Sequence, residues 1–348
     1  MNSGESRAGG ADERERLEEA LRLLRESSVG LGETSLARLR HLPGGWSRHS
    51  YVLELPGQAA SSEFIIRVKP PGSLLDTDIA MEHALYEMLQ DYDVPTPRVL
   101  GFEPGVGNPF GGPFFIMELL PGHAPNVWQR GDRAELEADW AAGGAIGGQL
   151  ADILARIHTI EDPRAAAIAG PCSFVDLVAK WRGVWQRISM RPDPVMDEVW
   201  PWLLSRAPDD VHWGLVHGDY RIGNMLVDNG RISGVIDWEL CHWGDTRFDL
   251  GYVVLKYMGG KFFRVGSDLV SAVAELDWFL ERYERESGLS VDREVVRTYS
   301  AFGAAILITI LATGAHEFAQ GRTTDIRMVW NRFVMPGLRQ DLTGLMDW

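Results

Sequence analysis

The chain has 348 residues, with 34 basic and 49 acidic side chains and a formal net charge of −15. A nucleic-acid-binding surface is usually basic, so this balance argues against a general nucleic-acid binder. It is compatible with a cationic substrate but does not select one. The two cysteines, Cys172 and Cys241, lie far apart. We therefore expect no disulfide framework and no zinc site, but a soluble protein in the reducing cytoplasm.

The first hundred residues predict a small β-rich lobe. Leu17, Ala20, Leu21 and Leu24 repeat at helical spacing. "GGWSRHSYVLELPG" and "SSEFIIRVKPPG" are strand-like, a helix is expected from about residue 78 to 90, and "PFFIMELLPG" predicts another strand ended by its Pro-Gly pair. The expected division is a disordered tail over residues 1–12, an N-lobe over 13–118 and a C-lobe over 119–348.

The remainder is predicted to be mainly helical. "AELEADWAAGGAIGGQLADILARIHTI" indicates one long helix or two, and helical patterns run from Phe248 to the end. Residues 163–212 are rich in Pro and Trp and are expected to be irregular. The uncharged segment Thr298–Ala315 is at the lower length limit for a membrane span. Its hydroxyl groups and closely flanking charges favour a buried helix, so we expect no membrane partner.

The segment "LVHGDYRIGNMLVDNGRISGVIDWE" has the pattern of a β-hairpin with polar groups at its outer ends. Its "DNG" is a strong two-residue turn signal. Counting outward from that turn pairs Met225 with Gly234 and places Asn224 opposite Val235, with Asp237 one diagonal step away. The pattern therefore predicts that Asn224 and Asp237 lie close together.

These side chains indicate a site for a hard metal ion. An amide oxygen with a carboxylate and no thiolate suits Mg²⁺ better than zinc. Asp219, five residues before Asn224, is a further carboxylate that could accept a proton from an attacking hydroxyl group. A metal ion, a base and precise positioning are what phosphoryl transfer needs.

Three motifs in this order resemble those of the aminoglycoside phosphotransferase-like small-molecule kinases, which include choline-kinase-type enzymes. "HGDYRIGN" resembles their catalytic loop, "IDWE" their metal-binding segment and "GDTRFDL" the motif that follows. The sequences of these motifs and of "RVKPPG" are most similar to the branch associated with acyl-CoA dehydrogenases. The resemblance implies an α+β, bilobal, protein-kinase-like fold, with Asp219 as the catalytic base, Asn224 and Asp237 as Mg²⁺ ligands, and ATP or GTP as the phosphate donor.

The predicted N-lobe offers a separate test of this resemblance. Glu82 falls within an apolar helical stripe, where a charge is costly unless it is paired. Arg67 and Lys69 share one face of the preceding strand, so strand periodicity alone cannot choose between them. The register of the family favours Arg67 as the phosphate-positioning cation that pairs with Glu82, and Lys69 is the alternative.

The resemblance implies further nucleotide contacts. Ser47, in "PGGWSRHSY", stands where the family covers the phosphates, although the loop lacks a full G-x-G-x-x-G. The backbone near Met117 and Leu119 corresponds to the hinge strand that contacts the adenine.

Several polar residues also have structural interpretations. His217 is better explained as a packed scaffold residue than as a ligand, and "TRFD" fits a helix capping box formed by Thr246 and Asp249. In the family the second aspartate of this motif braces the catalytic loop. Trp181 and Trp185, four residues apart, are expected to pack in the core or a lid, with substrate stacking as the alternative.

The expected function is Mg²⁺-dependent transfer of a nucleotide γ-phosphate to a hydroxyl of a small molecule, either aminoglycoside-like or of a hydroxy-acid or acyl type. Two alternatives stay open. A nucleotide-binding pseudokinase scaffold would tolerate loss of the three polar hairpin residues, and all three are present. A metal-dependent phosphoesterase could use the same carboxylates but would not require a glutamate paired to a strand cation. The oligomeric state cannot be inferred from the sequence.

Overall fold

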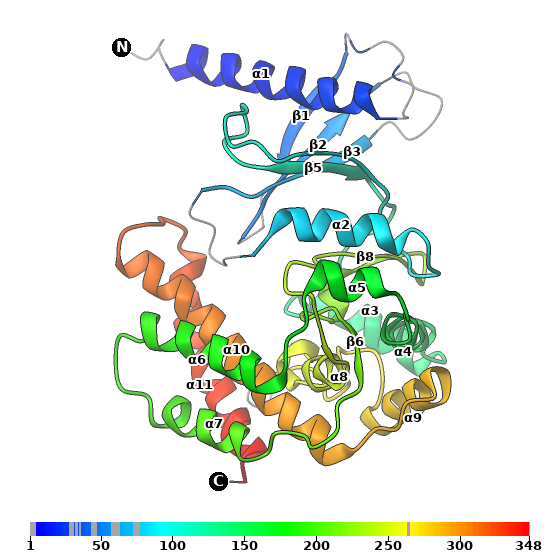
Figure 1. Ribbon diagram of the computed structural model, residues 1–348, viewed down its shortest axis with the longest axis vertical. Helices are drawn as coiled ribbons and strands as arrows, with labels where there is room; N and C mark the ends of the chain where they lie inside the picture. The colour runs from blue at the N-terminus through cyan, green and yellow to red at the C-terminus, as the bar shows by residue number, and fades with distance from the viewer. Residues whose placement is uncertain are drawn as a thin grey trace. The chain divides into compact units, whose positions relative to one another are not determined.

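The computed structural model describes residues 5–27, 31, 34, 36–42, 47–56, 63–71, 77–262 and 265–347. The chain forms two compact units, unit 1 over Met1–Pro121 and unit 2 over Gly122–Trp348. The sequence led us to expect a division a few residues earlier, after residue 118. Unit 1 contains a β-sheet and unit 2 is mainly helical, which confirms the expected protein-kinase-like α+β fold (Figure 1).

Unit 1 is built on a five-stranded antiparallel sheet with the strand order β1-β2-β3-β5-β4. Its elements are α1 (Glu5–Glu26), β1 (Arg38–Leu42), β2 (His49–Glu54), β3 (Glu63–Val68), α2 (Ile79–Leu89), β4 (Val99–Glu103) and β5 (Phe114–Glu118). Helix α1 begins at Glu5 and so includes residues 5–12, which we had assigned to a disordered tail. The strong helix formers from Glu13 onward explain this extension, because helix propagation is easier than nucleation.

The two faces of the sheet carry different chemistry. Phe64, Ile66 and Val68 of β3 belong to one apolar cluster with the α1 leucines. Strand alternation turns Arg67 to the opposite face, where it reaches Glu82 on α2. Helices α1 and α2 accordingly lie on opposite sides of the sheet (Figure 1). One strand thus supplies both core packing and a buried cation.

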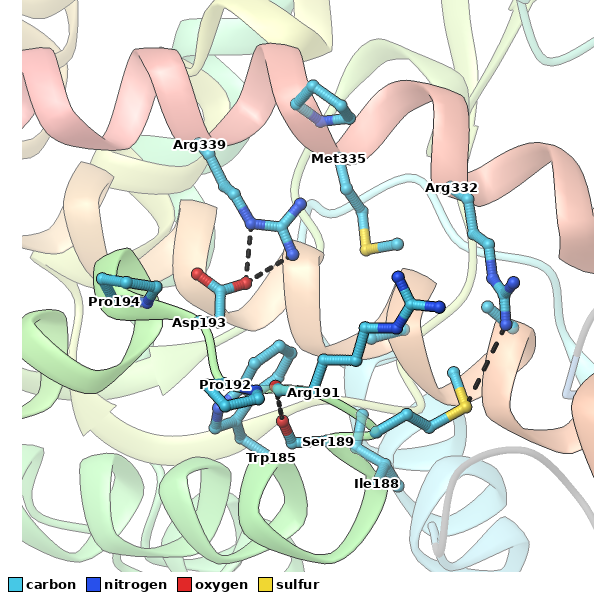
Figure 2. A pocket seen from close by; sticks show the side chains of 14 residues that line it. Trp185, Ile188, Ser189, Arg191, Pro192, Asp193, Pro194, Arg332, Met335 and Arg339 are labelled. Carbon is cyan, nitrogen blue, oxygen red and sulfur yellow. Dashed lines mark hydrogen bonds and ion pairs between the residues drawn. The ribbon is translucent and has the colours of Figure 1, made fainter.

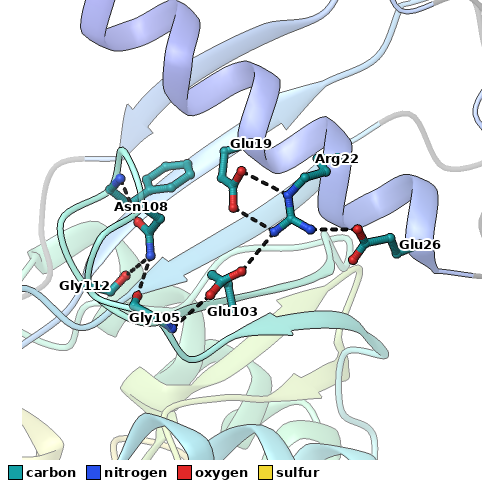
Figure 3. A network of polar contacts seen from close by, with 8 residues as sticks. Glu19, Arg22, Glu26, Glu103, Gly105, Asn108 and Gly112 are labelled. Atoms are coloured by element: carbon teal, nitrogen blue, oxygen red, sulfur yellow. Dashed lines mark hydrogen bonds and ion pairs between the residues drawn. The ribbon is translucent and has the colours of Figure 1, made fainter.

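Helix α1 is attached to the sheet by a charged network as well as by its leucines (Figure 3). Arg22 pairs with Glu19 and Glu26 in the helix, at 2.8 and 2.7 Å, and with Glu103 of β4 at 2.9 Å. In the turn after β4, the Asn108 amide donates to two backbone carbonyls at 2.6 and 2.9 Å. These contacts fix the packing of α1 against the β4 end of unit 1.

Unit 2 combines helices with two small antiparallel ladders, β6 with β9 and β7 with β8. Its elements are α3 (Arg130–Ala141), α4 (Ala145–His158), α5 (Pro163–Ala169), α6 (Phe174–Ile188), α7 (Pro194–Leu204), β6 (Trp213–Val216), η1 (Ile222–Asn224), β7 (Met225–Asp228), β8 (Arg231–Val235), β9 (His242–Asp245), α8 (Arg247–Val253), η2 (Lys256–Gly259), α9 (Leu276–Ser287), α10 (Arg293–Ala319) and α11 (Arg327–Leu345). The pattern that allowed one long helix or two forms two, α3 and α4. They separate at Gly143 and Gly144, whose φ values are 126° and 67°.

The expectation that residues 163–212 are irregular was wrong, because α5, α6 and α7 lie within them. Asp162, Ser173 and Asp193 cap these helices by accepting backbone N–H bonds, and Pro163 and Pro194 occupy first-turn positions. The high Pro content therefore marks helix starts.

Helix α10 forms the centre of unit 2, and it contains the uncharged segment that we expected to be a buried helix. It is long and apolar enough to cross a membrane by length and composition, but 83% of its most apolar window is buried inside the structure. It lies against α8 at Gly251, where an added Cβ would approach the Tyr299 Cβ to 2.4 Å and the Ser300 nitrogen to 2.7 Å. The close approach of these two helices therefore requires a glycine.

We predict that Gly251→Ala destabilises the protein by about 1–3 kcal/mol, because overpacking a tight helix contact forces the backbone to shift. The matched control is Gly183→Ala in α6, where the nearest atom to an added Cβ is a flexible Arg187 nitrogen at 3.6 Å. That change should be neutral or stabilising by up to about 1 kcal/mol. Urea unfolding midpoints test both variants, and equal effects would show that the α8–α10 contact adapts without cost.

Candidate active site

The centre of the candidate site is the loop between β6 and β7, which holds Asp219. The Asp219 carboxylate accepts from the Arg221 Nε at 3.1 and 3.2 Å and from the Asn224 amide nitrogen at 2.6 Å. Its side chain keeps 17% of its surface exposed. Burial and the Asp219 charge raise the pKa of the Tyr252 phenol well above its usual value, so this group stays protonated. The Asp219 carboxylate is therefore fixed by two side-chain donors, Arg221 and Asn224, while still open to solvent.

The backbone of this loop is bound by Asp249 of α8, which is fully buried. Its two oxygens accept the N–H groups of His217 at 2.7 Å and Gly218 at 2.9 Å. Burial alone would raise the Asp249 pKa, but the hydrogen bond and charge of His158 and the His217 N–H lower it, so it stays ionised. Gly218 has φ 86°, and a Cβ there would lie 2.3 Å from the Leu240 carbonyl oxygen. A glycine is thus required where the loop turns.

His217 is a packed scaffold residue, and its ring is neutral. Its Nδ1 accepts the Asp219 N–H at 3.2 Å and its Nε2 donates to the Ile236 carbonyl at 3.1 Å. Burial lowers its pKa, although the nearby acids oppose this effect. The ring also packs on Trp238 with centroids 4.5 Å apart. His217 therefore connects the catalytic loop to the segment that carries Asp237.

The hairpin register differs from the prediction by one residue. Val227 pairs with Ile232 as expected, but Met225 pairs with Val235 and not with Gly234, because the ladder shifts between Leu226 and Val227. The extra residue on β8 forms a bulge, which a count from the turn cannot foresee. In consequence, Asn224 does not face Val235. Its backbone carbonyl instead accepts the Ile236 N–H at 3.0 Å.

Asn224 and Asp237 have the chemistry of a Mg²⁺ site. The Asn224 amide nitrogen is committed to Asp219, which leaves its Oδ1 as a hard oxygen donor, and Asp237 adds a carboxylate. Asp237 has φ 71°, an uncommon conformation for a residue with a side chain. Within the described ranges, no three His, Cys, Asp or Glu side chains gather as a metal site. A two-ligand site is what Mg²⁺ uses when phosphate and water complete its shell.

In unit 1, Glu82 is completely buried and forms two ion pairs. Arg67 Nη2 lies 3.1 Å from one carboxylate oxygen, and Arg48 Nε lies 3.5 Å from the other. Lys69, the alternative to Arg67, instead donates to the backbone carbonyl of Thr77. The structure therefore joins Glu82 to Arg67 and adds Arg48, which the sequence analysis did not identify.

The remaining predicted nucleotide contacts all lie in unit 1. Ser47 is buried, and the glycines that precede it in the loop lie outside the described residues. Met117 pairs with Ile65 in the sheet. The Leu119 N–H donates to the Glu63 carbonyl at 3.3 Å, so this N–H is engaged within unit 1.

One residue of unit 2 was missed, and one of the two interpretations of the "TRFD" motif was wrong. Arg221 could have been noticed as a cation two residues after Asp219. Thr246 occupies the N-cap position of α8, but its side chain makes no capping hydrogen bond, so the capping-box interpretation was wrong. The acid that would complete the box, Asp249, turns to the catalytic loop instead. Asp245 forms an ion pair with Arg247.

A braced aspartate and an oxygen-donor hairpin in unit 2, and a buried strand–helix ion pair in unit 1, are features that kinase-type phosphoryl transfer uses. The model of the phosphotransferase enzyme family matches residues 38–289. The chain belongs to that family and is a small-molecule kinase.

Known proteins extend this comparison. Mouse acyl-CoA dehydrogenase family member 10 is 27% identical over 248 residues, which are 69% of this chain but only 22% of the mouse protein. A Ralstonia eutropha protein assigned as an aminoglycoside phosphotransferase has a TM-score of 0.72 and 21% identity over 95% of this chain and 98% of its own. A thermostable aminoglycoside phosphotransferase mutant, in complex with ADP and hygromycin B, has a TM-score of 0.55 and 16% identity over 89% of this chain and 95% of its own. The two structures establish the fold alone.

We predict that Arg67 and Glu82 are energetically coupled and that Lys69 and Glu82 are not. A double-mutant cycle of Arg67→Met with Glu82→Gln should give a coupling free energy of about 2–3 kcal/mol, because both groups are buried and in contact. The matched cycle with Lys69→Met should give less than about 0.5 kcal/mol. Denaturant unfolding measures both cycles, and a larger value for Lys69 would reverse the assignment.

A second prediction concerns pH. The folded His217 pKa is lowered, so below the unfolded value of about 6.5 the unfolded chain binds a proton that the folded chain excludes. Stability should therefore fall as pH decreases from about 6.5, by up to about 1.4 kcal/mol per pH unit from this group. His217→Gln should show a shallower slope in urea unfolding between pH 6.5 and 5. Above pH 7.5 the two proteins should respond alike, and identical acid slopes would contradict the assignment.

Proposed function

We propose that this kinase transfers the γ-phosphate of ATP or GTP to a hydroxyl group of a small molecule in a Mg²⁺-dependent reaction. One observation carries the proposal: the Asp219 carboxylate is held by Arg221 and Asn224 but still reaches solvent. A base must be fixed in direction and open to its substrate, and this carboxylate meets both requirements.

Each polar residue of unit 2 has a role in this scheme. Asp219 orients the acceptor hydroxyl and takes its proton as the new bond to phosphorus forms. Asn224 and Asp237 would hold Mg²⁺, which neutralises charge on the phosphates when it is bound. Arg221 keeps Asp219 aligned until the substrate arrives. Asp249 acts through the backbone, as a positioning residue.

The nucleotide end is assigned to unit 1. Arg67, fixed by Glu82, would position the phosphates, because kinase-type transfer uses a strand cation paired to a helix glutamate. Ser47 would cover the phosphates, and the backbone near Met117 and Leu119 would contact the base. The engaged Leu119 N–H favours the carbonyl groups of this segment as the contacting atoms. ADP in the structural neighbour supports a nucleotide donor.

The acceptor class is the broader part of the proposal. Hygromycin B in the structural neighbour supports an aminoglycoside-like molecule, and the similarity to the acyl-CoA dehydrogenase family member supports a hydroxy-acid or acyl type. Both classes present a hydroxyl group to a general base. The shared chemistry is therefore an alcohol acceptor.

We predict that Asp219→Asn lowers phosphate transfer by about 10²–10⁴-fold, because it removes the base and keeps the side-chain shape. Nucleotide binding should survive. Asp237→Ala should instead abolish the Mg²⁺-dependent part of the thermal shift produced by ATP or GTP. A saturating ligand at 100 times its dissociation constant stabilises a protein by about 2.7 kcal/mol, which a melting curve detects.

The matched control is Asp228→Asn, at the end of β7 beside the hairpin turn, which should change neither quantity. Acceptor screening with aminoglycosides, amino alcohols and hydroxy acids measures nucleotide consumption and phosphorylated product. An Asp219→Asn enzyme with a near-normal rate would contradict the assigned base. Failure of every nucleotide to shift the folded wild type would contradict the nucleotide site.

A further inference from the structure

Unit 2 contains a cavity of about 810 Å³ that the phosphotransfer scheme does not use (Figure 2). It lies between the end of α6, the segment before α7, the last turns of α10 and the middle of α11. It is distant from the catalytic loop along α10. Gly303 lies against Tyr252 of α8, the helix whose Asp249 binds the catalytic loop, whereas Ala312 lines the cavity about 14 Å further along the helix axis.

The polar side of the cavity is cationic. Arg191, Arg332 and Arg339 all line it, with Asp193 as the only carboxylate among its lining residues. Asp193 is already used, because one oxygen accepts the Arg339 Nε at 2.7 Å and the other caps α7 through Met196 at 3.3 Å. The chain as a whole has a formal net charge of −15, so a cavity with more arginines than carboxylates differs in sign from the protein as a whole.

The other two guanidinium groups are not neutralised within the described part of the chain. Among the residues that the structure describes, the Met190 sulfur is the one hydrogen-bond partner of Arg332, at 4.0 Å, and no carboxylate lies within ion-pair distance of Arg191. Figure 2 shows the Arg191 side chain extending into the space between Arg332 and Arg339. The two unpaired guanidinium groups, Arg191 and Arg332, repel each other, and an anion placed between them would relieve that repulsion.

The other walls are apolar. Trp185, Ile188 and Met335 are almost fully buried and line the cavity with Ala312 and Ala315. A bare inorganic anion would leave these surfaces without a partner. A molecule that joins an anionic head to an apolar body would satisfy both parts of the cavity.

We propose that this cavity binds an amphipathic anion, a carboxylate or phosphate monoester carried on an apolar body. The head group lies between Arg191 and Arg332, where guanidinium forks form charge-assisted hydrogen bonds. The body packs on Trp185, Ile188 and Met335. The inference stands on the cavity itself and does not depend on the proposed kinase reaction.

Three probes with the same ten-carbon chain test the proposal: decanoate, decyl phosphate and decanol, each below its aggregation limit. Calorimetry and thermal shift on the full chain give the affinities. At least one of the two anions should bind more tightly than decanol, and the stronger anion identifies the head group. Arg191→Gln and Arg332→Gln should each weaken that binding about tenfold or more, because each removes a charge-assisted hydrogen bond.

The matched control is Arg187→Gln, which removes the same charge from an exposed position on α6 outside the cavity. It should keep the wild-type affinity. Since Arg191 and Arg332 are also exposed, unliganded variants should melt as the wild type does. Equal binding of all three probes, unchanged affinity in both Gln variants, or equal loss in the Arg187 control would overturn the proposal. Absence of binding by both anions to folded wild type would overturn it as well.

Discussion

The candidate active site depends on one buried interaction, the pair of hydrogen bonds that the backbone of the catalytic loop donates to Asp249. A loop backbone turned into a helical interior has N–H groups that need acceptors, and an ionised carboxylate supplies two at once. His158 offsets the cost of burying that charge, and its other ring nitrogen contacts the Tyr283 hydroxyl at 2.8 Å. The chain of contacts thus runs from α9 through α4 and α8 to the loop. The Asp219 carboxylate is held in a defined position because these contacts restrain the backbone that carries it.

Unit 1 also uses a buried carboxylate to hold another group, but here the group that is held is positively charged. There, a completely buried glutamate is placed between two arginines from different segments, one on β3 and one before β2. Burying ions costs free energy, so a buried ion pair contributes little to the stability of the fold. Its role is better explained as holding the Arg67 side chain in one place. Both units therefore use a buried carboxylate to fix another charged side chain, Asp219 through the backbone of its loop and Arg67 directly.

The local chemistry was readable in the sequence to a large extent. Helix α2 was anticipated nearly to the residue, since Asp78 caps it and Glu82 interrupts its apolar stripe. The residues of the catalytic loop were singled out because polar groups gather at the outer ends of an apolar hairpin and because the three motifs resemble those of a known family. What escaped detection depends on tertiary packing. A bulge at β8 requires no special residue, and Arg48 meets Glu82 only when the segment before β2 and helix α2 come together in the fold.

The left-handed backbone at Asp237 has a consequence for the residues that this position can accept. Branched and bulky side chains are strongly disfavoured there, while glycine, asparagine and aspartate enter this conformation most readily. Two of those three carry an oxygen that can bind a hard cation, and the third carries no side chain. The backbone conformation therefore limits which residue types can occupy position 237, independently of any bound metal. Chemical function and backbone conformation select nearly the same residues.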